Sequence, residues 1–242
     1  MKDIDQQVPN NEQVNPEPIP APLTGREGLD LVKASTAKVE GVSLSASPEI
    51  TKEWLKDMMT LEVEIKADFG EVLKQLRVDT GADLQPRPDG YHLTIVGPTE
   101  YKVLSVLDDD TISELERINE QIQKGQGITV KGIGFIDGSS NEYRLRETDA
   151  VKKTAFIAFD IPALQEFRTR AGLPPKDFHV TLGFVGGDIN MRVLREEPIK
   201  PNSPKMKYIT EPIPKKANSR FDGIVLPEIN YGKLDGQMKQ QK

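Results

Sequence analysis

The chain has 242 residues, of which 36 % are apolar, and its formal net charge is −6. It contains no cysteine, which excludes disulfide frameworks, thiolate metal sites and cysteine nucleophiles. No apolar run approaches the roughly 18 residues of a membrane span, and the N-terminus lacks a hydrophobic signal core. We therefore expect a cytoplasmic protein without a membrane partner. The acidic balance argues against extended binding to duplex DNA, but not against a short nucleotide held in one local basic cleft.

Three segments differ in composition. Residues 1–50 are rich in Gln, Asn, Pro and acidic side chains, which predicts a disordered or extended acidic arm, with short helices at 28–39 or 51–58. Residues 51–190 carry the periodic patterns of a folded domain. Residues 191–242 are basic and rich in Pro and Lys, and they predict a tail with one short strand at 223–226.

The first half of the folded domain begins with alternating apolar and charged residues at 61–66, which predict a half-buried strand. An apolar stripe then predicts a helix from about Asp68 to Gly81. After the strand that carries His92, a capping pattern at Thr111 predicts a helix that reaches about residue 124.

The second half is predicted to contain strands at 128–136, 143–145 and 154–159. Pro162 is typical of a helix start, and Gly172 is placed to end that helix. The strand that carries His179 follows. The order of strand, helix and histidine-bearing strand therefore occurs twice.

Both histidines of the chain lie in the same short pattern, Tyr91-His92-Leu93-Thr94-Ile95 and Phe178-His179-Val180-Thr181-Leu182. Successive side chains of a strand point to opposite faces, so each histidine shares a face with the threonine two places on. Two such strands brought together would offer two imidazoles and two hydroxyls to one cleft, a set suited to proton transfer around a phosphate.

The repeat predicts an α+β fold built from duplicated β-α-β units. We expect two lobes, at about 61–110 and 125–186, which are interleaved and related by approximate twofold symmetry. Each lobe would contribute an antiparallel sheet and its histidine-bearing strand to a central cleft, and extended or disordered tails would flank the domain.

The paired motifs His92-Leu93-Thr94 and His179-Val180-Thr181 resemble those of the two-histidine (2H) phosphoesterase superfamily, which includes 2′,5′ RNA ligase-like proteins and cyclic phosphodiesterases. The resemblance covers about residues 60–186. It implies a bilobal fold with a central cleft and metal-free chemistry on phosphodiesters at a ribose 2′ oxygen. Phe184 to Gly187 follow the second motif where many members carry a basic residue, so the resemblance does not assign the substrate.

Cleavage of a phosphodiester needs one proton removed from the attacking oxygen and another delivered to the leaving oxygen. Imidazole suits both tasks because its ordinary pKa lies near 6.5. We expect His92 and His179 to be the catalytic pair, with the acid and the base unassigned, and Thr94 and Thr181 to bind phosphate oxygens. The expected substrate is a 2′,3′-cyclic phosphate or a 2′-5′ linkage at a nucleotide or RNA end.

Two alternatives stay open. One is a nonhydrolytic nucleotide- or RNA-binding module that keeps the same cleft, and the other is a scaffold whose tails matter more than its cleft. Retention of both histidines and both threonines favours the enzyme, because binding alone needs no paired acid and base.

Other residues are weaker candidates for contact with the substrate. Tyr143 is a candidate for stacking on a base, and the candidate phosphate or ribose contacts are Arg87, Lys176, Arg144 and Lys153. Tyr91 and Phe178 lie on the strand face opposite the histidines and are expected in the core. The aspartates at 108–110 precede a capped helix, which favours capping over metal binding. No metal and no cofactor is expected.

Overall fold

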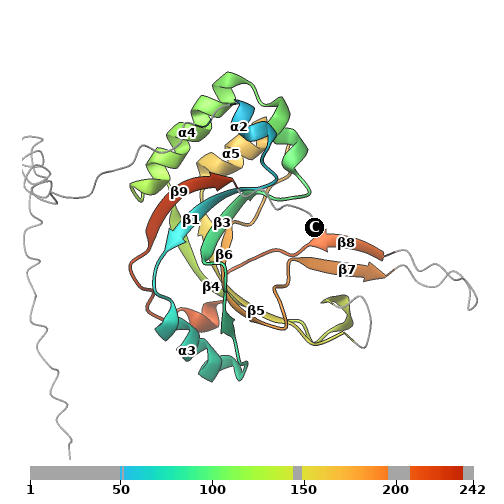
Figure 1. The fold of residues 1–242 in the computed structure, drawn as a ribbon. Coiled ribbons are helices and arrows are strands. Elements are labelled where there is room, and N and C mark those ends of the chain that lie inside the picture. Colours follow the sequence, from blue (N-terminus) through green and yellow to red (C-terminus); the bar gives the residue numbers. More distant parts are fainter. Residues whose placement is uncertain (1–49, 51, 144–148, 196–207, 237–242) are drawn as a thin grey trace, which may run out of the picture. The chain divides into compact units, whose positions relative to one another are not determined.

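The computed structural model describes residues 50, 52–143, 149–195 and 208–236 (Figure 1). These residues all lie within one compact unit, Ser47–Lys242. The acidic arm and its expected helix at 28–39 lie outside the described residues. The helix expected at 51–58 is present as the short α2, Lys52–Lys56.

The first sheet contains the first histidine-bearing strand. Its strand order is β3-β1-β9, with β1 at Leu61–Lys66, β3 at Tyr91–Val96 and β9 at Asn230–Gly236. Both β3 and β9 pair antiparallel with β1. The alternating pattern holds on β1, where the apolar residues are buried, except that Glu62 is also buried.

The second sheet contains the other histidine-bearing strand. Its order is β2-β6-β5-β4, and all neighbours are antiparallel. The bounds are Gln85–Pro86 for β2, Thr129–Asp137 for β4, Lys153–Asp160 for β5 and His179–Val185 for β6.

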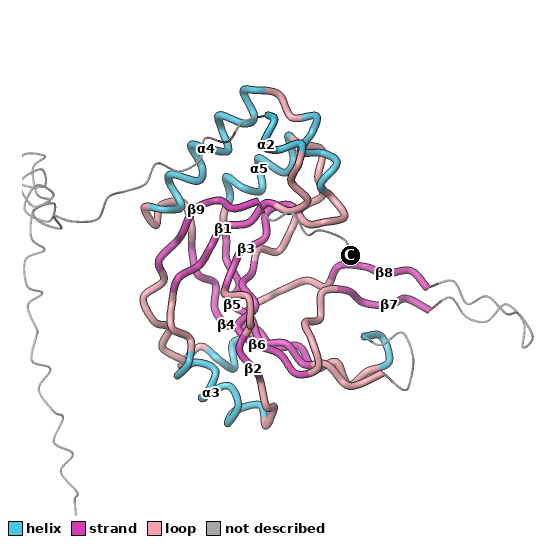
Figure 2. Tube along the Cα trace, viewed as in Figure 1, coloured by secondary structure: helices cyan, strands magenta, loops and turns pink. Residues whose placement is uncertain are grey.

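The two halves repeat one arrangement. Helix α3, Gly70–Thr80, lies between β1 and β3 in the chain, ahead of the two-residue strand β2, and helix α5, Pro162–Arg170, connects β5 to β6. In each half the strand before the helix pairs antiparallel with the histidine-bearing strand after it. Strands β3 and β6 contact each other and run near the middle of the described region (Figure 2). The predicted α+β architecture with antiparallel sheets is confirmed.

Helix α4, Asp109–Gln123, packs on α5 and β9. Its N-cap differs from the expected one: the Asp108 carboxylate accepts a hydrogen bond from the Thr111 backbone N–H, so Asp108 caps the helix and Thr111 lies inside it. The carboxylate oxygen satisfies an otherwise unpaired backbone donor of the first turn. The remaining short helices are 3-10 turns at Tyr101–Val106, Asn141–Tyr143 and Ser219–Phe221.

Two predicted strands need correction. The strand expected at 143–145 is not formed at Tyr143, which ends a 3-10 turn, and residues 144 and 145 lie outside the described residues. The strand expected at 223–226 is absent there. The strand that forms is β9, Asn230–Gly236, because the free edge of β1 supplies backbone partners that the sequence pattern does not reveal.

The C-terminal segment takes part in the fold where it is described. Strands β7, Met191–Arg195, and β8, Tyr208–Pro212, form an antiparallel pair that extends from the body of the domain (Figure 1). Beyond β8, Lys215, Phe221 and Leu234 are buried. Apolar side chains of both sheets and of helices α3, α4 and α5 belong to one continuous core, which holds β3 and β6 in place.

Candidate functional site

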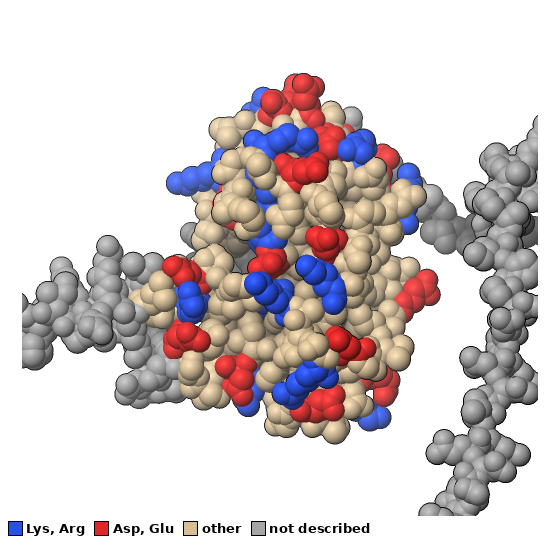
Figure 3. All heavy atoms as spheres, turned by 180° about the vertical axis from the view of Figure 1, so that it is seen from behind, with Lys and Arg blue, Asp and Glu red and all other residues tan. Residues whose placement is uncertain are grey.

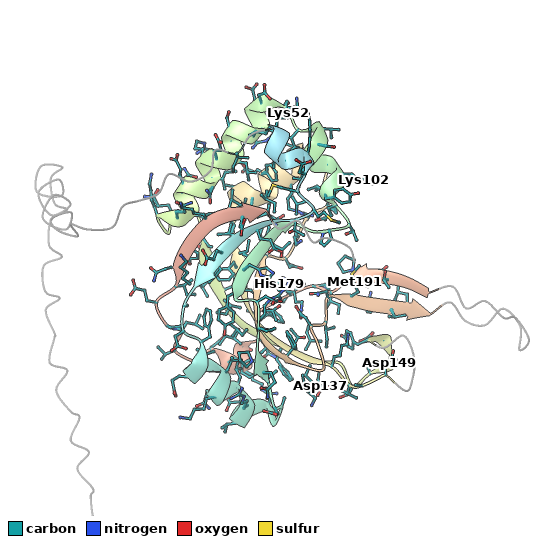
Figure 4. All side chains as sticks on the ribbon, in the orientation of Figure 1. Lys52, Lys102, Asp137, Asp149, His179 and Met191 are labelled. Carbon is teal, nitrogen blue, oxygen red and sulfur yellow. The ribbon has the colours of Figure 1, made fainter. Side chains whose placement is uncertain are left out.

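The two motif strands face one cleft. His92 and Thr94 on β3, and His179 and Thr181 on β6, all line a cavity of about 560 Å³. The aliphatic residues between and after them are buried in the core on the other face of each strand, as the alternation of a strand requires. Figure 4 shows His179 centrally in the domain, with Met191 at the start of β7. The structure therefore brings the four predicted site residues together.

The first motif has a carboxylate beside it. Glu62 of β1 lies opposite Thr94 in the strand register, and the Thr94 hydroxyl donates to Glu62 Oε1 at 3.1 Å. The same oxygen lies 3.4 Å from His92 Nε2. Glu62 is 6 % exposed, and its Oε2 atom has no hydrogen-bond partner among the described residues. The protonated form of His92 would form an ion pair with this carboxylate.

The second histidine is held through its other ring nitrogen. His179 Nδ1 lies 3.0 Å from the Asp177 carbonyl oxygen, which can only accept, so Nδ1 carries the proton. The Nε2 atom of the neutral ring then keeps a free lone pair. Burial, and next the positive charge of Lys215, lower the pKa of His179 to about 4. His179 is therefore neutral at pH 7 and can accept a proton.

Asp188 is the carboxylate beside the second motif. The Thr181 hydroxyl donates to Asp188 Oδ2 at 2.8 Å, and this oxygen lies 3.7 Å from Arg87. Lys215 Nζ lies 3.7 Å from the other oxygen, Oδ1. Burial raises the pKa of Asp188, whereas the charge of Lys215 and the hydrogen bond from Thr181 lower it. The lowering effects are together the larger, so the pKa of Asp188 lies below its ordinary value.

The two motifs thus have different surroundings. A carboxylate without a lysine or arginine within ion-pair distance among the described residues stands beside His92, whereas two cations flank the carboxylate beside His179. Burial and the charge of Lys215 favour a neutral imidazole at His179, whereas the carboxylate of Glu62 lies close enough to His92 to pair with a protonated ring.

A buried arginine joins the segments that carry the two motifs. Arg168 on α5 is 1 % exposed and donates to the Ile95 carbonyl oxygen at the end of β3 and to the Pro174 carbonyl oxygen in the segment before β6. It also makes a bidentate pair with Glu100, at 2.7 and 3.1 Å. Lys176 Nζ lies 3.8 Å from Glu100, and Lys176 lines the cleft. Burial lowers the pKa of Lys176, and Glu100 opposes that effect.

Not all of the other predicted contact residues line the cleft. Tyr143 and Lys153 are not among the described residues that line the cleft, and Arg144 lies outside the described residues. Lys153 pairs with Asp137 at 3.1 Å, and Figure 4 shows Asp137 apart from His179. Arg87, by contrast, does line the cleft.

Both aromatic residues that precede the histidines are found in or against the core. Phe178 is buried, and Tyr91 packs edge-to-face on Phe69 with ring centroids 4.7 Å apart. Both rings therefore pack where the sequence predicts, in or against the core.

The sequence reasoning missed Glu62, Asp188 and Lys215. The alternating pattern of β1 predicts a solvent-facing Glu62, and only the register of β1 against β3 shows that it faces Thr94. Asp188 follows the second motif after two glycines, and Lys215 comes from a segment expected to be a tail. No pattern in the sequence marks either of them.

Three further findings concern the described residues. No cluster of three or more His, Asp or Glu side chains among them has an arrangement suited to a metal ion, and Asp108 serves as a helix cap. None of the described helices has the length and apolar character needed to cross a membrane.

On the face shown in Figure 3, lysine and arginine side chains are intermingled with aspartate and glutamate.

The family comparison agrees with the geometry. The family model described as "Swiss Army Knife, 2H phosphoesterase domain" matches residues 59–190, more than half of the chain. The chain belongs to the 2H phosphoesterase superfamily. Neither the curated proteins nor the solved structures compared with this chain give a match.

Proposed function

We propose that this protein is a metal-independent phosphodiesterase that acts on a nucleotide or RNA end, at a phosphodiester that involves a ribose 2′ oxygen. The observation that carries the proposal is the meeting of both His-Thr pairs in one cleft. Paired imidazoles provide both proton transfers that the reaction needs. Membership of the superfamily supports phosphoesterase chemistry, and the 2′ oxygen is carried over from the resemblance of the motifs.

The surroundings of the histidines support a division of roles. His179 Nε2, with its free lone pair, removes the proton from the attacking oxygen, which is water in the hydrolysis of a cyclic phosphate. His92, protonated beside Glu62, delivers its proton to the departing ribose oxygen. One bond to phosphorus forms and one breaks, and the products are a phosphomonoester and a free hydroxyl. The two rings exchange protonation states, which solvent then restores.

The negative charge of the phosphate needs donors beyond the histidines. Arg87 and Lys176 line the cleft and are the cations proposed to face the phosphate. The Thr94 and Thr181 hydroxyls both donate to carboxylates in the structure. The role proposed for them requires each hydroxyl to rotate toward a phosphate oxygen, which leaves each carboxylate able to accept a hydrogen bond from a substrate hydroxyl.

A turnover screen tests the proposal. The full chain is incubated in chelator with 2′,3′-cyclic nucleotides, 2′-5′ oligonucleotides and cyclic dinucleotides, beside the His92→Ala and His179→Ala variants. We expect turnover of at least one of the first two classes by the native chain and a loss of that turnover in both variants. Binding of these compounds without turnover would favour the alternative, a nonhydrolytic nucleotide- or RNA-binding module.

A second comparison tests the 2′ oxygen. The 2′-deoxy analogue of a 2′-5′ dinucleotide is taken as the 3′-5′-linked deoxydinucleotide, and that of a 2′,3′-cyclic nucleotide as the 2′-deoxy-3′,5′-cyclic nucleotide; each keeps a phosphodiester but has no 2′ oxygen to act as nucleophile or leaving group. The analogue should bind with modest loss and show no turnover above background. Equal rates on ribo and 2′-deoxy substrates would reduce the proposal to a generic phosphodiesterase.

A further inference from the structure

Lys215 is a buried charged residue to which the proposed reaction assigns no step. It follows β8, outside the residues 59–190 that the family model matches, and it is 3 % exposed. A buried ammonium group is unfavourable unless it is well partnered. Its Nζ atom donates to the Ile189 carbonyl oxygen at 2.6 Å, lies 3.7 Å from Asp188 Oδ1 and is 5.0 Å from the centroid of the Phe156 ring.

Two of these partners touch the second motif directly. Asp188 accepts the hydrogen bond of the Thr181 hydroxyl. Phe156 packs edge-to-face on the His179 ring, with centroids 5.9 Å apart. The ammonium group therefore lies one contact away from both members of the motif. Lys215 also lines the cleft.

We propose that Lys215 is a positioning residue of the second motif: it holds Asp188 against Thr181 and places a positive charge near His179. This inference rests on the proposed function and deepens it, because a nearby cation keeps the ring in the proton-accepting form. The charged groups that face His179 are Lys215, Lys176 and Asp188, and of these only Asp188 favours the imidazolium. A segment beyond the matched family region would thus act together with burial on the protonation state of a motif histidine.

The two histidines of the chain make a direct test possible. An NMR pH titration of the imidazoles of the full chain gives two sets of signals, and His92→Ala assigns them. In Lys215→Met, loss of the positive charge should move the pKa of His179 upward, toward its ordinary value. Lys215→Arg keeps the charge and should leave His179 with its low pKa. Lys216→Met, at the exposed neighbouring position, is the matched control and should change nothing.

Kinetics give a second readout on any substrate found by the screen. The acidic limb of the kcat profile of Lys215→Met should move to higher pH, so that kcat at pH 5 falls about twofold, while KM changes little, because burial, the larger cause of the low pKa, remains. A purely structural role would lower the amount of active protein without moving the limb.

The outcomes separate the two proposals. An unchanged pKa of His179 in folded Lys215→Met overturns the positioning role. A raised pKa in a protein that turns over no substrate supports the positioning role and counts against the proposed function. If Lys215→Met does not fold, Lys215→Gln, which keeps a donor for Ile189 without the charge, is titrated instead. If neither neutral variant folds, Lys215 is a structural residue and the inference is overturned.

Discussion

Replacing Arg168 with methionine should destabilise the protein more than any comparable surface change. The guanidinium is 1 % exposed and makes hydrogen bonds to two backbone carbonyls and to both oxygens of Glu100. The methionine side chain would fill much of the volume but supply no donor. Removing one partner of a buried ion pair costs about 3–5 kcal/mol, and we expect the lower end here: the Ile95 and Pro174 carbonyls lose their donor, but Glu100 keeps Lys176 at 3.8 Å. For a domain of this size, that loss corresponds to a fall in Tm of about 10 °C.

The measurement is urea unfolding of the full chain, with Arg170→Met as the control. Arg170 lies on the same helix but is 48 % exposed, and it pairs with Glu114 at 3.5 Å, so its replacement should cost less than about 1 kcal/mol. Adding Glu100→Gln to Arg168→Met should restore part of the loss, because the carboxylate that has lost its arginine partner is then removed. Equal effects of the two arginine replacements would refute the reasoning, since burial is the cause of the expected difference.

Four further predictions concern the cleft. His92→Ala and His179→Ala should each lower kcat by roughly 10²-fold to 10⁴-fold without loss of the fold, which circular dichroism checks. Thr94→Val and Thr181→Val should lower kcat by about 10-fold to 10³-fold. Full turnover in either alanine variant would remove that histidine from the mechanism. Activity should survive EDTA, whereas a loss that a divalent ion restores would indicate a metallophosphodiesterase. In the pH profile of kcat/KM, the acidic limb should lie near pH 4, because the base is His179 with its lowered pKa, and a limb near 6.5 would contradict that assignment. Between about pH 4 and pH 6.5 the folded chain keeps His179 neutral, whereas the unfolded chain binds a proton there, so stability falls as the pH drops through this range. Denaturant unfolding of the native chain and of His179→Asn should give a free energy of unfolding that depends less steeply on pH in the variant.

The local patterns predicted much of the fold. Alternation identified β1, and the glycine after helix α3 adopts the left-handed conformation expected of a helix end, with φ +64° at Gly81. The cap of α4 was misplaced because Thr111 and Asp108 both fit a capping pattern, and only the backbone geometry distinguishes them. Strand β9 was missed because its residues have no strand pattern, and its pairing with β1 depends on a partner far away in the sequence.

The sequence by itself determined which residues can meet across the cleft. The period of a strand places each histidine on the same face as its threonine, whatever the rest of the fold does, and the repeated order of elements implies two strands of the same kind. Those are local properties of the backbone, so a few consecutive residues are enough to establish them.

The tertiary structure decided what surrounds each histidine, and so how the two differ. Glu62 reaches Thr94 only through the register of two strands 32 residues apart, and Lys215 reaches Ile189 only because the chain returns after β8. The protonation state of an imidazole depends on burial and on charges within a few ångströms, and those neighbours come from distant segments. Two nearly identical sequence motifs therefore acquire different chemistry only when the chain is folded.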